Sequence, residues 1–286
     1  MQGEVGPGAA GPARSLLRIT IAAAAIASVA NILGGITFHS RLLVLNGLTC
    51  IANLVTTVVS SFYYLKSMMP PDKDHPLGHA GYSFSSAVFA LLVYAFVLGL
   101  GVDEVLNPSP YRVSGIAWTV PLGVAVLYSI AVLAGKSVGG EVEVYANLTT
   151  SEIAESLVAL VITPLAHSYG YWIDRLGALG MLIYLAYQVV TNGRSVLYEL
   201  SMPSPPPELV NRLINDIRSM GYEVKDLRLR SIARSQVIGY VVIGVPSDLS
   251  VEEAHKAADL LERLAKSKYN VDLVVHVEPK GPERNA

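Results

Sequence analysis

The chain has 286 residues, of which 52% are hydrophobic and 15% are charged, with a net charge of −2. Soluble domains carry about 25% charged residues, so this composition favours a membrane protein. The net charge gives no basic field for nucleic acid, and the one cysteine, Cys50, excludes an intrachain disulfide framework. Residues 1–15, MQGEVGPGAAGPARS, are polar and Gly-rich, and they predict a disordered tail that lacks the pattern of a cleaved signal.

Six apolar segments follow within residues 16–200, and a bilayer core of about 30 Å needs roughly 20 such residues in a helix. They predict six transmembrane helices, near Ile19–Phe38, Leu42–Leu65, Ala80–Val102, Val113–Gly135, Val144–Tyr169 and Leu176–Asn192. Pro121 and Pro164 fall inside the fourth and fifth segments, where neighbouring helices can satisfy the freed backbone groups. Lys and Arg are more frequent on the side with both termini, which predicts a multi-pass cell-membrane protein with cytoplasmic termini.

After the last apolar segment the composition changes. The Pro-rich stretch SMPSPPPE predicts a linker over residues 201–207, followed by a small soluble domain over residues 208–280 and a tail over residues 281–286. VKDLRLRS and VDLVVHVEP alternate as half-buried strands do, and VIGYVVIGV is an apolar strand. SVEE forms a capping box that opens a helix from Ser250. The order α-β-β-α-β favours a cytoplasmic ferredoxin-like α+β domain with helices on one face of the sheet.

Polar residues at membrane depth are the first candidates for function, because ionisable groups are costly there. Glu152 and Glu155 lie three residues apart, on nearly one face of the fifth helix. The second helix carries a polar stripe made of Asn46, Thr49, Cys50, Asn53 and Thr56. If the two stripes face each other, they form an oxygen-rich pocket that suits a divalent cation.

Simpler roles stay open for several of these side chains. For Thr56 and Cys50 we prefer hydrogen bonding between helices, and for Asn53 both interpretations stand equally. Glu155 could instead lie near the cytoplasmic end and reach water. His39 and His167 lie near the outer ends of their helices, and we interpret both as interfacial.

The loop after the second helix, PPDKDHPLGHAGYS, holds two of the six histidines. Asp72, His75 and His79 supply one carboxylate and two imidazoles, which are enough to hold a borderline metal ion with water. The alternative is that Pro76 and Gly78 shape a turn whose histidines are merely solvated.

Together these features resemble the cation diffusion facilitator family. SRLLVLNGLTCIANL is similar to the family's entry to its second helix, DKDHPLGH to its D-x-x-H-x-x-G-H loop, and YGYWIDRLGALGMLIYLAYQ to its sixth helix. The resemblance covers nearly the whole chain. It implies a transporter and not an enzyme: a homodimeric, proton-coupled exporter with no cofactor, whose substrate is a divalent metal ion. Manganese, zinc, iron and cobalt all stay open.

The resemblance also places metal sites. The family's transport site falls on Thr49, Asn53, Leu148 and Glu152, of which only Glu152 is ionisable. Zinc prefers nitrogen and sulfur ligands, so these oxygen atoms favour a harder cation such as manganese. Asp72, His75 and His79 match the family's loop site. In the C-terminal domain the matching residues are His255, His276 and Glu278, with Val242 in place of a further histidine. The alternative is that these three are ordinary polar residues of the surface that bind no metal.

We therefore expect divalent-cation efflux by alternating access, with protons as counter-ions. The partners are a second copy of the chain, membrane lipid, divalent cations and protons, and no nucleic acid. A transport-degenerate relative that binds metal as a sensor or scaffold is the alternative. An intramembrane hydrolase using His75 and His79 fits less well, because no base or nucleophile is paired with them.

Overall fold

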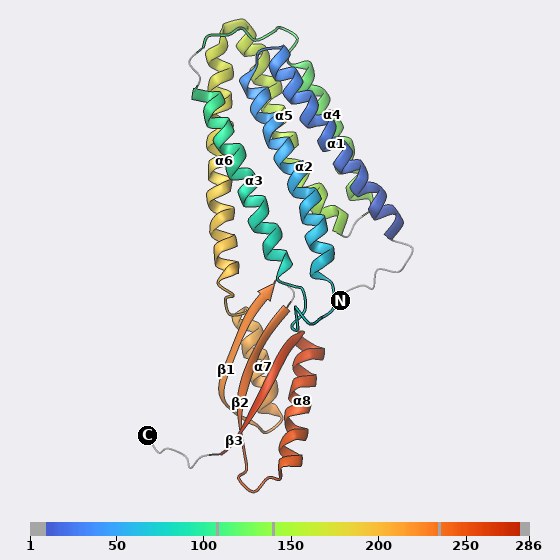
Figure 1. Cartoon of the computed structure of the whole chain (residues 1–286), viewed down its shortest axis with the longest axis vertical. Helices are drawn as coiled ribbons and strands as arrows, with labels where there is room; N and C mark the ends of the chain where they lie inside the picture. The colour runs from blue at the N-terminus through green and yellow to red at the C-terminus, as the bar shows by residue number, and fades with distance from the viewer. Residues whose placement is uncertain (1–9, 107–108, 139–140, 234–235, 281–286) are drawn as a thin grey trace. The chain divides into compact units, whose positions relative to one another are not determined.

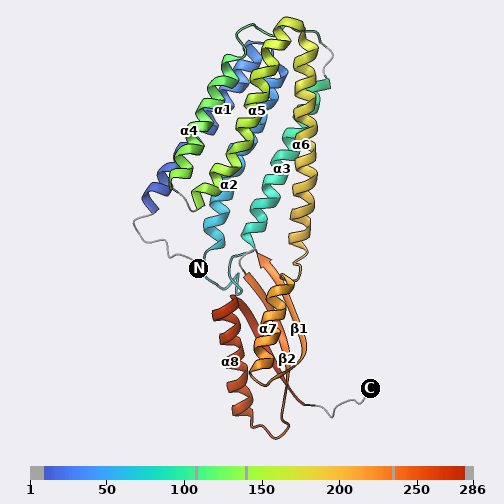
Figure 2. The same cartoon turned by 180° about the vertical axis from the view of Figure 1, so that it is seen from behind.

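The computed structural model describes residues 10–106, 109–138, 141–233 and 236–280. In this part of the chain six long helices come first, and they run side by side as a bundle (Figures 1 and 2). They are α1 (Ala10–Thr37), α2 (Arg41–Ser67), α3 (Tyr82–Leu106), α4 (Thr119–Val138), α5 (Glu141–Tyr169) and α6 (Tyr171–Leu200). The chain divides into two compact units. One holds most of this bundle, and the other holds Tyr63–Ser85 together with the chain from Arg194 onward.

Among the six helices, α1 and α4 begin farthest from the predicted residues. α1 begins at Ala10, so residues 10–15, expected in a disordered tail, are helical, while residues 1–9 and 281–286 lie outside the described residues. α4 begins at Thr119 and not at Val113. Pro12 and Pro121 each lie in the first turn of a helix, where a backbone N–H has no helical partner to lose. Pro121 is therefore a residue of the helix start, whereas Pro164 lies inside α5 as predicted.

The surface of the bundle is strongly apolar. By length and composition, three helices within the described ranges are able to cross a membrane, namely α2, α3 and α6, and shorter apolar stretches occupy Ile21–Thr37 and Thr119–Leu133. Phe96, Leu133 and Ile183 each expose more than 60% of their surface. A surface covered with such side chains suits lipid better than water.

Asp174, in the first turn of α6, is fully buried and joins the starts of two helices. Its Oδ1 accepts a hydrogen bond from the Ser40 hydroxyl at 2.6 Å, and its Oδ2 accepts from the Arg41 backbone N–H at 2.8 Å. The Tyr111 hydroxyl also donates to Oδ2 at 2.9 Å. Because the first N–H groups of a helix lack partners within it, the carboxylate acts as the cap of α2. The Arg41 guanidinium in turn donates to the Glu104 carbonyl in α3 at 2.8 Å.

We expect Asp174→Ala to lower the free energy of unfolding by roughly 3 kcal/mol, because several buried donors would lose a charged acceptor. Thermal unfolding of the full chain in detergent measures the change. Asp103→Ala, which removes an exposed carboxylate from α3, is the control and should have little effect. Equal stability of the two variants would contradict the anchoring role of Asp174.

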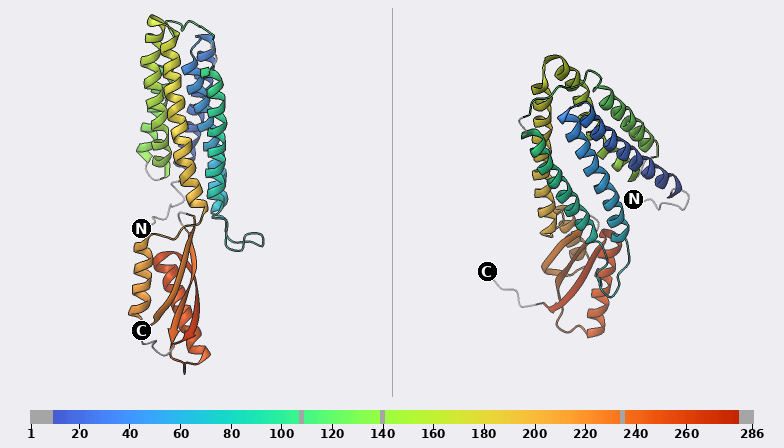
Figure 3. Two further views of the ribbon diagram at one scale, coloured as in Figure 1. Left: turned by 90° about the vertical axis from the view of Figure 1, so that its left-hand side faces the viewer. Right: turned by 45° about the horizontal axis from the view of Figure 1, so that its top comes forward.

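The C-terminal domain has the predicted order of elements, namely α7 (Pro207–Ser219), β1 (Glu223–Ala233), β2 (Gln236–Val245), α8 (Val251–Tyr269) and β3 (Val271–Pro279). The sheet order is β1-β2-β3, with β1 antiparallel and β3 parallel to β2. Leu213 of α7 and Leu261 of α8 pack with Val241 and Val271 in one buried core, so both helices cover the same face of the sheet (Figures 2 and 3). The predicted capping box is confirmed, because Ser250 and Glu253 exchange hydrogen bonds at the start of α8.

Candidate metal centres

Helices α2 and α5 bring their polar stripes together inside the bundle. The Asn53 amide donates to Glu152 Oε1 at 3.2 Å, and the Cys50 thiol donates to Glu152 Oε2 at 3.2 Å. One turn away, Thr49 Oγ1 lies 3.1 Å from Glu155 Oε2. Thr49, Cys50 and Glu152 are almost completely buried. The structure thus places two carboxylates, one hydroxyl, one amide and one thiol along a single contact between two helices.

Three of the predicted site residues, Thr49, Asn53 and Glu152, lie in this constellation, and two of its members were not predicted as ligands. Glu155 faces Thr49, although the sequence alone also allowed it to reach water at a helix end. Cys50 donates to Glu152 of α5, which agrees with the hydrogen bonding between helices that the sequence favoured for it. The sequence did contain a signal for these two contacts, because residues three and four apart share one helix face. By that rule Thr49 shares a face with Asn53 on α2, next to Cys50, and Glu152 shares a face with Glu155 on α5. The Leu148 side chain lies outside the described residues.

The loop between α2 and α3 forms a second centre. Asp72 Oδ1 accepts the backbone N–H of His75 at 2.7 Å and that of Asp74 at 3.0 Å, which closes a tight turn. The hydrogen bond from His75, assisted by the nearby His79, lowers the pKa of the Asp72 carboxyl below its ordinary value. Gly78, with a φ of 87°, allows the chain to reverse before His79. Asp72 is therefore held as a charged carboxylate beside both imidazoles.

The ring of His79 has an orientation that suits metal binding. Its Nδ1 lies 3.0 Å from the carbonyl oxygen of Pro70, which can only accept, so this nitrogen carries the proton. In the neutral ring Nε2 is then an acceptor, and it faces Asp72 Oδ2 at 3.3 Å. Two acceptors at this distance are stabilised by a cation between them. His75 Nδ1 is buried without a hydrogen-bond partner, and the ligand atoms of Asp72, His75 and His79 lie within 4.8 Å of one another. The three side chains fit a borderline divalent metal ion.

We expect His79→Ala to weaken metal binding at the loop by at least about tenfold, because loss of an outer partner of a metal site already costs that much. Equilibrium dialysis of Zn²⁺ or Mn²⁺ against the full chain measures the effect. The parent chain and the His79→Ala variant both carry Glu152→Gln, which weakens binding between α2 and α5. Asp74→Ala is the matched control, since Asp74 contributes only its backbone N–H to the turn. Equal affinities in the two variants would exclude His79 as a ligand.

The C-terminal candidates lie on two different elements. His276 Nε2 and Glu278 Oε1 are 3.7 Å apart on β3, so they share a face of the sheet as predicted. His255 lies on α8, where its Nδ1 is 3.7 Å from Asp259 Oδ1. Among the residues that the structure describes, the loop triad is the one group of three or more His, Cys, Asp and Glu with ligand atoms so close together. A single chain therefore does not gather His255, His276 and Glu278 into one site.

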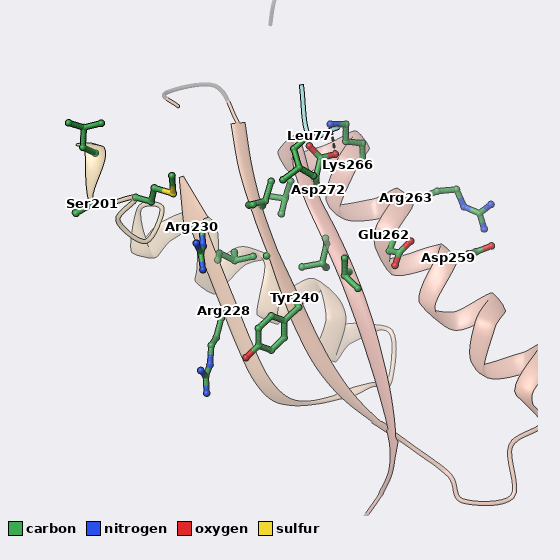
Figure 4. A pocket seen from close by; sticks show the side chains of 18 residues that line it. Leu77, Ser201, Arg228, Arg230, Tyr240, Asp259, Glu262, Arg263, Lys266 and Asp272 are labelled. Atoms are coloured by element: carbon green, nitrogen blue, oxygen red, sulfur yellow. Dashed lines mark hydrogen bonds and ion pairs between the residues drawn. The ribbon is translucent and has the colours of Figure 1, made fainter. Parts of the chain in front are cut away.

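The face of the sheet opposite α7 carries an open hollow of about 1330 Å³. Figure 4 shows Arg228, Arg230 and Tyr240 on the strands, with charged side chains of α8 at the margin. Val274, at the centre of β3, is 65% exposed in this hollow. The same compact unit includes the loop that carries Asp72, His75 and His79, and the Gln236 amide donates to the Leu77 carbonyl of this loop at 3.1 Å. This face is an apolar and charged surface without a covering element in the described part of the chain.

Comparison with known proteins covers both parts of the chain. A family model described as the cation efflux transmembrane domain matches residues 17–201, and one described as the cytoplasmic domain of cation efflux proteins matches residues 205–280. The manganese efflux system protein MneS of Bacillus subtilis (strain 168) is 26% identical over 284 residues, which cover 91% of this chain and 93% of that protein. The uncharacterized transporter YdbO of the same strain is 26% identical over 282 residues, with coverages of 91% and 93%. The cation-efflux pump FieF of Citrobacter koseri is 25% identical over 226 residues, with coverages of 74% and 75%.

Proposed function

The chain belongs to the cation diffusion facilitator family of cation efflux proteins, and on this premise we propose that it exports divalent metal ions through an oxygen-rich site between α2 and α5. The observation that carries the proposal is the pair of carboxylates, Glu152 and Glu155, each held by a polar side chain of α2. A bare dication is very costly inside a bilayer, and two carboxylates offset its charge. Oxygen ligands suit manganese, and the similarity to a manganese efflux protein supports that substrate.

The transport cycle that we propose is alternating access with protons as counter-ions. Asp72, His75 and His79 capture the cation at the cytoplasmic loop, and the cation then passes to Glu152, with Asn53 and Thr49 as neutral oxygen ligands. Protonation of the carboxylates on the opposite side weakens their hold on the cation and releases it. A bound cation or bound protons offset the negative charges of Glu152 and Glu155. In either loaded state the transporter can therefore change between its inward-facing and outward-facing conformations.

We expect Glu152→Gln to reduce metal transport to the background of empty liposomes, because the substitution keeps the shape of the side chain and removes its charge. Mn²⁺ entry into proteoliposomes, followed together with a proton-sensitive dye, measures the cation and the counter-ion. His75→Ala should raise the Mn²⁺ concentration needed for half-maximal transport and leave the maximal rate nearly unchanged, because the loop captures the ion and is not the path.

Asp103→Asn is the control for charge loss on the bundle, and it should transport as the unmodified chain does. Transport that persists in Glu152→Gln would contradict the proposed site. A chain that binds metal at the loop and carries none would favour the sensor or scaffold function instead.

For the placement in the membrane, we propose that all six helices of residues 16–200 cross the bilayer and that both termini are cytoplasmic. The apolar surface of the bundle supports the first point, and the excess of Lys and Arg on one side supports the second. In this arrangement the loop at Asp72 faces the cytoplasm, where the exported cation is bound.

A Lys73→Cys variant in a Cys50→Ser background tests this orientation, because the cysteine introduced at position 73 is then the single thiol of the chain. An impermeant maleimide should label everted vesicles and not intact cells. Labelling of intact cells at the rate of everted vesicles would reverse the proposed topology.

For the assembly, we propose a homodimer that uses the open sheet face of the cytoplasmic domain, over residues 208–280. An exposed Val274 beside Tyr240 gives this face an apolar centre, and charged side chains surround it, which is the usual composition of an interface. A His276 and Glu278 pair from each copy would come near the other across such an interface.

We expect a fragment of residues 203–280 to fold alone and to sediment as a dimer, because α7, α8 and the three strands share a buried core. Val274→Asp should shift the fragment to monomer, since it places a charge at the apolar centre. Val251→Asp makes the same change at an exposed residue in the first turn of α8 and should leave the dimer intact. Dissociation in both variants, or in neither, would place the interface elsewhere.

A further inference from the structure

Cys50 adds a sulfur atom to an otherwise oxygen-rich site. It is the single cysteine of the chain, it is completely buried, and its Sγ lies 3.2 Å from Glu152 Oε2. The thiol thus contacts the carboxylate to which the proposed function assigns the cation.

Buried polar side chains from three helices surround this sulfur. Asn31 Nδ2 of α1 lies 3.7 Å from Cys50 Sγ, and Asn46 Oδ1 of α2 lies 3.8 Å from it. Tyr128 of α4 packs in the same buried cluster as Cys50.

Asn31 and Asn46 are completely buried, and each keeps one polar atom without a hydrogen-bond partner, namely Asn31 Oδ1 and Asn46 Nδ2. Leaving a buried polar atom unpaired costs about 1–3 kcal/mol, so ordinary helix packing does not account for two of them beside one thiol. The unpaired Asn31 amide oxygen is a potential cation ligand, because an amide oxygen is an acceptor. A cation bound beside Cys50 and Glu152 would satisfy the unpaired Asn31 oxygen, which packing within the described residues leaves without a partner.

We propose that Cys50 is a direct ligand of the transported cation beside Glu152, and that its sulfur sets the selectivity of the site. This inference rests on the proposed transport function. Sulfur binds borderline and soft dications well and binds Mg²⁺ and Ca²⁺ poorly, because those ions prefer oxygen. When the cation binds, the thiol proton leaves to water and a thiolate remains as the ligand. One sulfur among oxygen ligands excludes the abundant hard cations while it still admits manganese, iron, cobalt, zinc and cadmium.

Cadmium binding to the purified full chain tests whether the sulfur is a ligand. A bond between Cd²⁺ and a thiolate gives a charge-transfer absorption band in the ultraviolet, and in this chain such a band reports Cys50 alone. We expect the band in the unmodified protein, a weaker band in Glu152→Gln, and no band in Cys50→Ser. Absence of the band at Cd²⁺ concentrations that block Mn²⁺ transport would overturn the proposal.

Transport measures the effect on selectivity. Cys50→Ser replaces sulfur by oxygen and should weaken inhibition by Cd²⁺ at least about tenfold, as expected for loss of a metal-site residue. The Mn²⁺ concentration for half-maximal transport should change much less, and Mg²⁺ should become a better competitor. Unchanged inhibition by Cd²⁺ and by Mg²⁺ in Cys50→Ser would overturn the selectivity role.

A second variant controls for the presence of a buried thiol. Ala52→Cys in the Cys50→Ser background places a thiol on the same helix, against Val97 and Leu185 and away from Glu152. It should restore neither the band nor the sensitivity to Cd²⁺, and restoration by this variant would overturn the proposal. If the unmodified chain carries no cation, the transport function fails, whereas the cadmium band still decides whether Cys50 binds metal.

Discussion

The buried carboxylate of Asp174 determines how the helices of the bundle are aligned. It fixes the start of α6 against the first backbone N–H groups of α2, and Gly170 joins α6 directly to the end of α5. Helices α2 and α5 run in opposite directions, so a register fixed at one end determines which residues meet in the middle. Thr49 faces Glu155 and, one turn farther along α2, Asn53 faces Glu152. A shift of one residue would rotate each side chain by about 100° and separate these pairs.

The two candidate centres differ in chemistry in a way that suits a transfer between them. The loop offers two imidazoles and one carboxylate with partial access to water, whereas the membrane site offers two carboxylates with neutral donors and one thiol. The first set can exchange ligands with solvent, and the second can offset the charge of an ion where water is scarce. The proposed order of events, capture at the loop followed by transfer to the bundle, follows this difference in environment.

Local patterns in the sequence predicted much of this structure. Apolar length predicted the long helices, strand alternation predicted the order of elements in the C-terminal domain, and the SVEE motif predicted the start of α8. The polar stripe of α2 and the carboxylates of α5 were each visible at helical spacing. The start of α1 was missed because Gly and Pro in residues 1–15 are typical of disorder, although Pro12 is tolerated in a first turn.

Contacts between distant segments could not be derived in the same way. Asn31 of α1 and Tyr128 of α4 lie near Cys50, and the apolar sequences of these helices contain no pattern that predicts either contact. The choice between water and Thr49 for Glu155 depends on the rotation of α5, which tertiary packing determines. In the C-terminal domain, the resemblance to the family assigned His255, His276 and Glu278 to a metal site, and the fold places His255 on a helix and the other two on a strand.

Under the proposed function, the unequal burial of the three candidate loop ligands has a consequence for the speed of metal exchange. The His79 side chain is 3% exposed and is held by the Pro70 carbonyl, whereas those of Asp72 and His75 are 50% and 40% exposed. Two ligands can therefore rotate away while the third keeps its position, so that an ion leaves stepwise through states with one protein ligand. In the proposed transport cycle, such a centre combines a fixed point of attachment with a short residence time, so the loop would deliver an ion instead of storing it.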